Sequence, residues 1–370
     1  MSGASHDERF MELALAEARK GAGRTSPNPL VGAVIVCDDQ VVARGYHHRA
    51  GSAHAEINAL AEAGPAAVGA TLYVTLEPCN HTGRTPPCSE AIITSGIRRV
   101  VFGLRDPNPL AGGGVERLRQ AGLDVHGPVL ESRCRELNFP FLKHVATGLP
   151  WVIMKAGMSL DGRISYRQGS GGAITGPAAH ERVHQIRDVA DALLVGRGTV
   201  AADNPSLTTR LPGGAGGRDP LRVILDTRLR LSPEARLLHQ ESSAPTWVFC
   251  GEAAPAERAA ALSAQGAVVH RVATSANGLD LGAVFRKLGS AGIQSVLVEG
   301  GAAVHGAMLR EGLVDQAMLF LAPFFIGEAG TPLIRGALSP SPEAVLPALR
   351  DVRVEQVGDD LLVTGLIRRP

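Results

Sequence analysis

One imidazole, two thiols and a carboxylate lie within a single short stretch of the chain. His54 and Glu56 stand two residues apart, and Cys79 is followed after eight intervening residues by Cys88. The rest of the stretch is built largely of Ala, Leu, Ile and Gly, so these four side chains are chemically distinctive within it. A fold that brings them to one point creates a site with metal-ligating and proton-carrying groups. That requirement constrains the first half of the chain more than any other feature.

Three local elements are predicted around these residues. The run from Gly51 to Leu60 predicts a helix with His54 and Glu56 in its first turn. Thr71–Leu76 predicts a short strand, and the tandem prolines before Cys88 predict that a second helix begins there. Residues two apart do not share a helix face. His54 and Glu56 can still converge at the N-terminal end, because helical side chains lean toward that end.

Convergence of His54, Cys79 and Cys88 would give zinc three protein ligands and leave the fourth position to water, which is the catalytic pattern. Zinc lowers the pKa of such a water to about 7. Glu56, which is not a ligand in this arrangement, could carry the proton to a departing amine. Zinc deaminases of nucleobases combine His-x-Glu with Pro-Cys-x-x-Cys, whereas eight residues separate the two cysteines here.

Other interpretations of these residues remain open at this point. A structural zinc site would need a fourth ligand, for which His81 is a candidate. Cys79 and Cys88 could instead form a disulfide, although the chain shows no secretory signal. Glu56 could be an ordinary solvated helix residue.

The longer pattern resembles the deaminase half of the bifunctional deaminase/reductase family of riboflavin biosynthesis. The resemblance rests on His-Ala-Glu at His54 and on Thr-Leu-Glu-Pro-Cys-Asn-His-Thr-Gly-Arg-Thr-Pro-Pro-Cys ending at Cys88. It implies the three-layer α/β/α fold of the cytidine deaminases. It also implies that Asn28 helps to hold the substrate ring near zinc, with His81 and Arg84 of the insert as further contacts.

The length of 370 residues predicts two domains rather than one core. The boundary is expected near Thr147-Gly148-Leu149-Pro150, which gives a deaminase domain at 1–148 and a reductase domain at 149–370. A strand begins at Trp151, and Lys-Ala-Gly-Met-Ser-Leu-Asp-Gly-Arg from Lys155 resembles the opening of the family's reductase domain. The resemblance implies a dihydrofolate-reductase-like α/β fold.

Two strand-to-helix turns predict a phosphate-binding cleft in the second half. The run from Ala192 to Val200 reads as a strand, a glycine turn at Gly196-Arg197-Gly198-Thr199 and a helix start, and the strand Ser295–Glu299 leads into Gly300-Gly301. Glycine lets a phosphate approach the backbone N–H groups of a helix N-terminus. The Gly-x-Gly-x-x-Gly fingerprint is absent from the sequence, so a Rossmann domain is not expected.

The resemblance further implies an NADPH cofactor and a set of contact residues. Cofactor contacts are implied for Gly157, Ala173, Thr199, Asp203, Thr227, Gly301, Ala302 and Ala303. Substrate contacts are implied for Gly171, Arg187, Leu207, Arg210 and Glu299. Lys155, a charged residue on a strand, is expected to face the cleft as a catalytic group that contacts the ribose or phosphate. Family members often carry a tryptophan where this chain has Ala173.

Composition excludes several classes of partner. The 37 basic and 36 acidic residues give a net charge of +1, which offers no broad surface for nucleic acid or an anionic membrane. Five scattered cysteines are typical of a reducing compartment, so a cytoplasmic location is expected. A homo-oligomer is compatible with the sequence.

The family resemblance implies two consecutive steps of riboflavin synthesis. The first half would deaminate a diaminopyrimidine that carries a phosphoribosylamino group, and the second would use NADPH to reduce its ribose to a ribityl chain. A deaminase of RNA or DNA bases is a competing interpretation, but only 4% of the residues are aromatic. The sequence is also compatible with a zinc-stabilised binding module and with a zinc nucleobase deaminase whose reductase half is inactive or altered.

Overall fold

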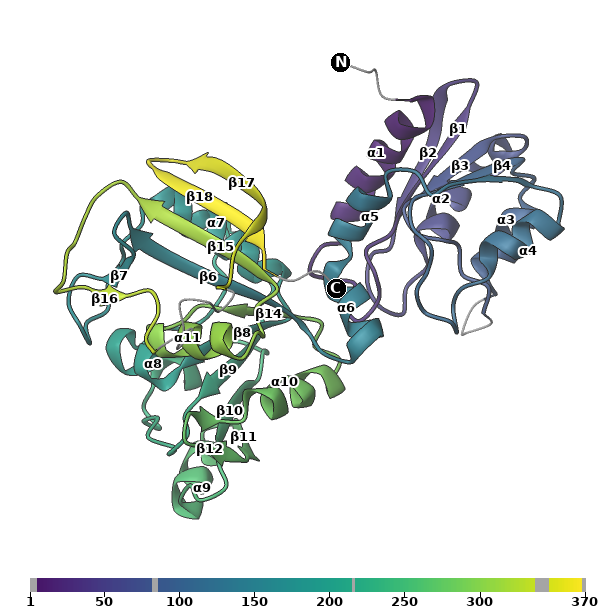
Figure 1. The fold of residues 1–370 in the computed structure, drawn as a ribbon. Helices are drawn as coiled ribbons and strands as arrows, with labels where there is room; N and C mark the ends of the chain where they lie inside the picture. The colour runs from purple at the N-terminus through teal and green to yellow at the C-terminus, as the bar shows by residue number, and fades with distance from the viewer. Residues whose placement is uncertain (1–4, 82–85, 215–216, 337–345, 368–370) are drawn as a thin grey trace. The chain divides into compact units, whose positions relative to one another are not determined.

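The computed structural model describes residues 5–81, 86–214, 217–336 and 346–367. Its residues separate into two compact units, Met1–Gly148 and Leu149–Pro370, each of which has a hydrophobic core of its own (Figure 1). Within the described ranges, no helix is long and apolar enough to cross a membrane.

The first unit contains one mixed sheet with helices on both faces. Its elements are α1 (His6–Arg19), β1 (Gly32–Cys37), β2 (Gln40–Tyr46), α2 (Ala55–Ala63), β3 (Thr71–Val74), α3 (Cys88–Thr94), β4 (Arg99–Phe102), α4 (Gly114–Gln120), β5 (Asp124–His126), α5 (Glu131–Leu137) and α6 (Phe139–Thr147). Among the described residues the strand order is β2-β1-β3-β4-β5. β3, β4 and β5 run parallel, and β1 is antiparallel to both of its neighbours.

Two glycines show that α1 and α2 cover opposite faces of this sheet. A Cβ on Gly32 would lie 2.1 Å from the carbonyl oxygen of Ala14 in α1, and one on Gly45 would lie 2.3 Å from that of Ala55 in α2. Gly45 pairs with Ala33, the residue after Gly32. Since successive residues of a strand point to opposite faces, the two helices pack on different sides. The expected three-layer α/β/α arrangement is confirmed.

The second unit is built on a larger sheet. Its strands are β6 (Trp151–Ser159), β7 (Arg163–Ser165), β8 (Ala192–Gly196), β9 (Leu221–Leu225), β10 (Thr246–Gly251), β11 (Ala267–Val272), β12 (Thr274–Ser275), β13 (Gly278–Leu279), β14 (Ser295–Val298), β15 (Gln316–Ala322), β16 (Thr331–Pro332), β17 (Arg350–Val357) and β18 (Asp360–Leu366). Its α-helices are α7 (Pro177–Val189), α8 (Arg197–Asp203), α9 (Ala256–Ala264), α10 (Leu281–Ser290) and α11 (Ala302–Arg310).

The main sheet of this unit has the order β11-β10-β9-β8-β14-β6-β15-β18-β17 in the part of the chain that the structure describes. Strands from β11 through β15 are parallel, and β18 and β17 are added in antiparallel fashion. β8 is apolar throughout because both of its faces are covered: Leu193 and Leu194 belong to different core clusters. The α/β class expected for the second half is therefore confirmed.

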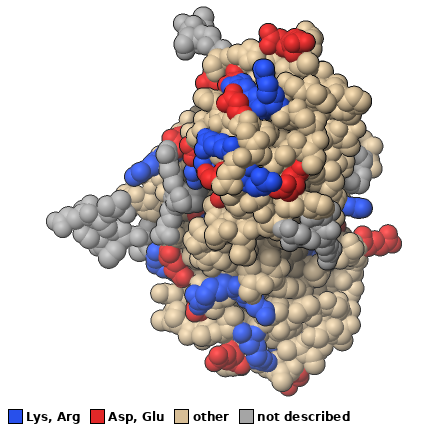
Figure 2. Space-filling view, turned by 90° about the vertical axis from the view of Figure 1, so that its right-hand side faces the viewer, with Lys and Arg blue, Asp and Glu red and all other residues tan. Residues whose placement is uncertain are grey.

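Charged side chains are interspersed on the molecular face shown in Figure 2. Lys and Arg alternate with Asp and Glu across this face, and no broad basic region is visible on it. This distribution agrees with the nearly balanced numbers of basic and acidic residues in the sequence.

Candidate active sites

The first unit brings the imidazole and the two thiols together. The Nδ1 atom of His54 lies 3.2 Å from the Sγ atom of Cys88 and 3.6 Å from that of Cys79. All three ligand atoms lie within 4.8 Å of one another, and no other group of His, Cys, Asp or Glu in the described ranges gathers in this way. The sequence spacing therefore identified residues that do converge.

The helix that carries Glu56 begins later than the sequence pattern predicted. α2 starts at Ala55, and His54 is its N-cap residue in an extended conformation. Before it, Ser52 closes a turn in which its hydroxyl donates to the carbonyl oxygen of Arg49. Gly51 has a φ of 83°, which a continuing right-handed helix does not allow. The prediction that the helix starts at Gly51 was wrong, whereas Glu56 does lie in the first turn.

The two cysteines are held together by backbone hydrogen bonds. The backbone N–H of Cys88 donates to the Sγ atom of Cys79 at 3.4 Å, and that of Ser89 donates to the Cys79 carbonyl oxygen at 3.2 Å. The hydrogen bond between the two side chains lowers the pKa of the Cys79 thiol and raises that of the Cys88 thiol. Both cysteines are free thiols in the structure.

The donor set fits zinc. Two sulfurs and one imidazole nitrogen are typical ligands of this ion, and a set of three leaves one coordination position open. His81, the fourth ligand considered for a structural site, is exposed and does not belong to the described cluster. Arg84, expected from the resemblance to contact substrate, lies outside the described residues.

Glu56 lies beside this cluster with a relative exposure of only 3%. Burial raises the pKa of its carboxyl to about 7, because water is not available to stabilise the charged form. Glu56 is therefore not an ordinary solvated helix residue.

Asn28 is connected to the cluster through a histidine to which the sequence assigned no role. The Nδ2 atom of Asn28 lies 3.0 Å from the Nε2 atom of His47, whose Nδ1 atom lies 3.0 Å from the carbonyl oxygen of Ala53. The rings of His47 and His54 pack edge to face at 5.5 Å. Asn28 is thus linked through His47 to His54, and its contact with the substrate ring stays a prediction.

Glu77 is a further residue of this site that the sequence did not single out. Its buried carboxylate accepts hydrogen bonds from the backbone N–H groups of Gly113 and Val115 at 3.1 Å and of Asp106 at 3.2 Å. These bonds fix the loop that follows β4 against the segment carrying Cys79. The sequence feature that could have identified Glu77 is its position two residues before the predicted ligand Cys79.

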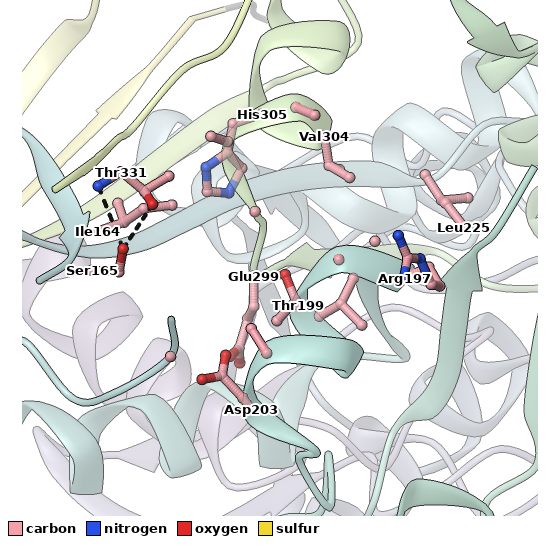
Figure 3. A pocket seen from close by; sticks show the side chains of 18 of the residues that line it. Ile164, Ser165, Arg197, Thr199, Asp203, Leu225, Glu299, Val304, His305 and Thr331 are labelled. Carbon is pink, nitrogen blue, oxygen red and sulfur yellow. Dashed lines mark hydrogen bonds between the residues drawn. The ribbon is translucent and has the colours of Figure 1, made fainter. Parts of the chain in front are cut away.

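The second unit contains a cavity of about 730 Å³ at the carboxyl ends of its parallel strands (Figure 3). Most of the residues predicted to contact cofactor or substrate line it. These are Lys155, Gly157, Gly171, Ala173, Arg187, Thr199, Asp203, Leu207, Thr227, Glu299, Gly301, Ala302 and Ala303. Arg210 is not among the lining residues: its backbone N–H donates to Nδ1 of His184, and its side chain donates to the hydroxyl of Thr208.

Glu299 is the centre of a buried charge cluster in this cavity. Its carboxylate accepts two hydrogen bonds from Arg187, at 2.7 and 2.8 Å, and lies 3.8 Å from the ammonium of Lys155. Burial alone raises the pKa of Glu299, but the charges of Arg187 and Lys155 outweigh it and lower the pKa to about 2. Arg187 also donates to the carbonyl oxygen of Thr208, so its guanidinium is already engaged within the protein.

Asp203, the last residue of α8, binds the glycine-rich segment that contains Gly171 and Gly172. Its carboxylate accepts a hydrogen bond from the backbone N–H of Gly172 at 3.2 Å. A Cβ on Gly171 would overlap the same carboxylate, so a larger residue there would displace the Asp203 side chain. Thr199 lies on the same helix, and its hydroxyl would be 3.3 Å from a Cβ placed on Gly301.

His305 also lines the cavity, although no role was predicted for it from the sequence. It lies on α11, four residues after Gly301, and only 1% of its surface is exposed. Burial lowers the pKa of its imidazole to about 4, which keeps the ring neutral at neutral pH. Its position in the first turns of the helix after Gly300-Gly301 was the signal that could have identified it.

Comparison with known proteins agrees with the division of the chain. Residues 4–104 match the cytidine and deoxycytidylate deaminase zinc-binding region, and residues 150–363 match the RibD C-terminal domain. The riboflavin biosynthesis protein RibD of Bacillus amyloliquefaciens is 43% identical, with 97% of this chain and 96% of the relative covered. The RibD protein of Aquifex aeolicus is 41% identical, with 96% of this chain and 97% of the relative covered.

Solved structures give the same result. RibD of Acinetobacter baumannii superposes with a TM-score of 0.86 at 36% identity, covering 98% of both chains. A deaminase/reductase from Thermotoga maritima superposes with a TM-score of 0.84 at 38% identity, covering 99% of both. The resemblance noted in the sequence is therefore confirmed over nearly the whole length of the chain. The enzymes of this family combine a zinc-binding deaminase domain with an NADPH-dependent reductase domain. The chain belongs to the RibD family of riboflavin biosynthesis enzymes.

Proposed function

We propose that Met1–Gly148 deaminates a phosphorylated diaminopyrimidine and that Leu149–Pro370 reduces the ribosyl group of the product with NADPH. The T. maritima relative is described as a diaminohydroxyphosphoribosylaminopyrimidine deaminase/5-amino-6-(5-phosphoribosylamino)uracil reductase. The observation that carries the proposal for this chain is the convergence of His54, Cys79 and Cys88 beside the buried Glu56.

In the first reaction the protein positions the substrate and moves a proton. His54, Cys79 and Cys88 would hold zinc, which when bound supplies a Lewis acid that activates water for attack on the ring carbon bearing the amine. Glu56 takes a proton from that water on a carboxylate oxygen and delivers it to the amine, which leaves as ammonia. Asn28, positioned through His47, holds the ring in place.

In the second reaction the cofactor supplies the chemistry and the cavity supplies the orientation. NADPH, when bound, donates the hydride to C1 of the ribosyl group. Thr199, Asp203, Thr227 and the turn from Gly301 to Ala303 hold the cofactor. Lys155 contacts the substrate ribose or phosphate with its ammonium, which Glu299 keeps in place.

The substrate contacts divide into direct and indirect ones. Because Arg187 already binds Glu299 in bidentate fashion, it acts by positioning that carboxylate. Gly171 and Leu207 shape the wall of the cavity. Arg210 is exposed and remains a proposed contact for the substrate phosphate.

A small phosphorylated pyrimidine fits this chain better than a nucleic acid does. The net charge of +1 gives no broad attraction to a nucleic-acid backbone, and the face shown in Figure 2 carries mixed charges rather than a basic groove. Ala173 lines the cavity at the position where family members often have tryptophan, and the remaining lining residues still provide the charged cluster around Glu299.

Crossed variants test both halves of the proposal. The purified chain is incubated with the diaminopyrimidine phosphate or with its deaminated product, in the presence and absence of NADPH, and the products are identified by mass spectrometry. Glu56→Gln should block ammonia release but still reduce added deaminated product. Lys155→Gln should release ammonia normally and accumulate the deaminated pyrimidine. Loss of both reactions in correctly folded single variants would contradict the assignment of separate sites.

A further inference from the structure

Cys79 differs from the other two residues proposed to hold zinc in how its backbone is fixed. His54 is the N-cap residue of α2, and Cys88 is the first residue of α3, so each is positioned by a helix. β3 ends before Cys79 is reached, and residues 77–80 belong to no helix or strand. The position of the Cys79 sulfur therefore depends on what holds this irregular segment in place.

Backbone hydrogen bonds hold the residues on both sides of Cys79 against the chain between β4 and α4. The backbone N–H of Glu77 donates to the carbonyl oxygen of Leu104 at 2.8 Å. The backbone N–H of Asn80 donates to that of Ala111 at 2.9 Å. The segment 77–80 is thus attached at both of its ends to one loop.

The side chain of Glu77 attaches the same loop to this segment a second time. Its Oε1 atom accepts from the backbone N–H groups of Gly113 and Val115, both at 3.1 Å, and its Oε2 atom accepts from that of Asp106 at 3.2 Å. Only 4% of Glu77 is exposed. Hydrogen bonds to an ionised acceptor are roughly twice as strong as neutral ones. One buried carboxylate therefore fixes both ends of the loop beside Cys79.

Close packing transmits the position of this loop to Cys79. A Cβ on Gly114 would lie 1.8 Å from the carbonyl oxygen of Pro78, so α4 begins directly against the residue before Cys79. On the other side, the side chain of Asn80 accepts a hydrogen bond from the hydroxyl of Ser89 at 2.9 Å. Because close-packed interiors transmit strain, a displaced loop displaces the backbone that carries the sulfur.

We propose that Glu77 is a positioning residue for the zinc centre, whose carboxylate holds residues 77–80 so that the Cys79 sulfur already lies where the ion binds. The inference rests on the proposed function, in which Cys79 is a zinc ligand. It adds a residue that controls metal affinity without touching the metal. Replacing a residue that orients a metal ligand typically lowers metal affinity by roughly 10–100-fold.

A second buried glutamate of the first unit provides a matched control. Glu17 on α1 is 3% exposed, and its carboxylate accepts hydrogen bonds from Lys20 and Arg44. α1 carries none of the three proposed zinc ligands. Loss of either carboxylate removes buried contacts from the first unit, but only loss of Glu77 should change the affinity for zinc.

The first test measures zinc affinity in the folded full-length chain. Glu77→Gln keeps the size of the side chain, and its amide oxygen can still accept from Gly113 and Val115, but its NH₂ group then faces the N–H of Asp106. Zinc is titrated against a chelator, and circular dichroism checks that each variant is folded. Glu77→Gln should bind zinc roughly 10–100-fold more weakly than the original chain, and Glu17→Gln should bind it equally tightly.

Two results of this test would overturn the inference. One is an unchanged zinc affinity in Glu77→Gln, and the other is an equal loss of affinity in Glu17→Gln. If Glu77→Gln does not fold, Glu77→Asp takes its place, because it keeps the carboxylate but shortens its reach by one methylene group. Weaker zinc binding by that variant would then support the inference, and normal binding would contradict it.

The second test asks whether Glu77 acts through the sulfur of Cys79. Zinc affinity is measured for Cys79→Ser and for the double variant with Glu77→Gln. Residues that act through one another show non-additive effects. Adding Glu77→Gln to Cys79→Ser should therefore weaken zinc binding much less than it does in the original chain. A full additive loss would show that Glu77 does not act through Cys79.

Both tests measure binding and not turnover, so they separate this inference from the proposed function. A chain whose zinc affinity depends on Glu77, but which leaves the diaminopyrimidine phosphate unchanged, would support the positioning role and contradict the proposed deamination. Normal deamination together with unchanged zinc affinity in Glu77→Gln would contradict the positioning role and leave the proposed function standing.

Discussion

Glu56 can carry a proton because of where the chain places it. It follows the N-cap residue His54 by two positions, is buried, and lies beside two thiols that form a ligand set with that histidine. A carboxyl in this position can reach the water and the amine without being a ligand itself. Its contribution should therefore be to the rate of deamination and not to metal binding.

The first prediction concerns this division of roles. Glu56→Gln should keep its zinc content, measured by metal analysis, and should lose deamination by roughly 10²–10⁴-fold, because general acid–base catalysis typically contributes that much. Glu62→Gln, an exposed change on the same helix, serves as the control and should deaminate normally. Normal ammonia release by zinc-loaded Glu56→Gln would show that another group moves the proton.

The second prediction concerns Glu299. Replacing it by glutamine leaves Arg187 and Lys155 buried without their counter-charge, and breaking a buried pair in this way costs roughly 3–5 kcal/mol of unfolding free energy. Glu355→Gln, which breaks an exposed pair with Arg182, should cost no more than about 1 kcal/mol. Both tryptophans, Trp151 and Trp247, lie in the second unit, so their fluorescence during urea unfolding reports on it.

The third prediction is the pH dependence of the same cluster. The pKa of Glu299 is lowered to about 2 from its usual 4.5. A lowered pKa means that the stabilisation is present above pH 4.5 and is lost as the pH falls toward 2. The original chain should therefore lose tryptophan-reported stability more steeply over this window than Glu299→Gln. Parallel acid profiles for the two proteins would contradict the prediction.

Residue types and spacing in the sequence were enough to predict the metal ligands, because His54, Cys79 and Cys88 belong to a long motif. The pairing of Arg187 with Glu299 was not predictable, since it joins residues far apart in the chain through the order of the strands. The family resemblance placed Arg210 with the substrate contacts, although Arg210 does not line the cavity. The family resemblance supplied the individual cofactor contacts.

At the scale of the elements, close helix–sheet packing positions the first site. α2 carries Glu56 and follows His54, and it lies directly on Gly45 of β2. α1 lies in the same way on Gly32 of β1 but carries no residue of the metal site. Two equally tight glycine contacts therefore support helices with different roles.

The fourth prediction compares these glycines. Gly32→Ala and Gly45→Ala should both destabilise the first unit, because each new methyl group meets a backbone carbonyl oxygen at 2.1 and 2.3 Å respectively. Only Gly45→Ala displaces the helix next to His54, so it should weaken zinc binding more, as measured by competition with a chelator. Equal zinc affinities in the two variants would show that α2 does not set the position of the site.

The elements themselves were largely predictable. Continuous apolar runs identified strands such as β8, and the proline pair identified the start of α3 at Cys88. The start of α2 was predicted too early, because the apolar pattern does not reveal the turn closed by Ser52 or the positive φ of Gly51. The order of strands in the second sheet could not be predicted, since it depends on contacts that are distant in the sequence.

At the scale of the whole molecule, the two sites belong to separate compact units with separate cores. The metal ligands lie in the first unit and the cavity lies in the second. Chemistry in one unit should therefore continue when the other is disabled, provided that the intermediate is supplied. The order of the reactions then follows from the substrates and not from a shared site.

The most direct test of this account is a product analysis before and after zinc removal. Chelated protein given the diaminopyrimidine phosphate and NADPH should leave the substrate unchanged, yet it should still oxidise NADPH and form the ribityl compound from added deaminated pyrimidine. Restoring zinc should restore ammonia release. Full deamination by protein shown to be metal-free, or loss of both activities on chelation while the second unit stays folded, would contradict the account.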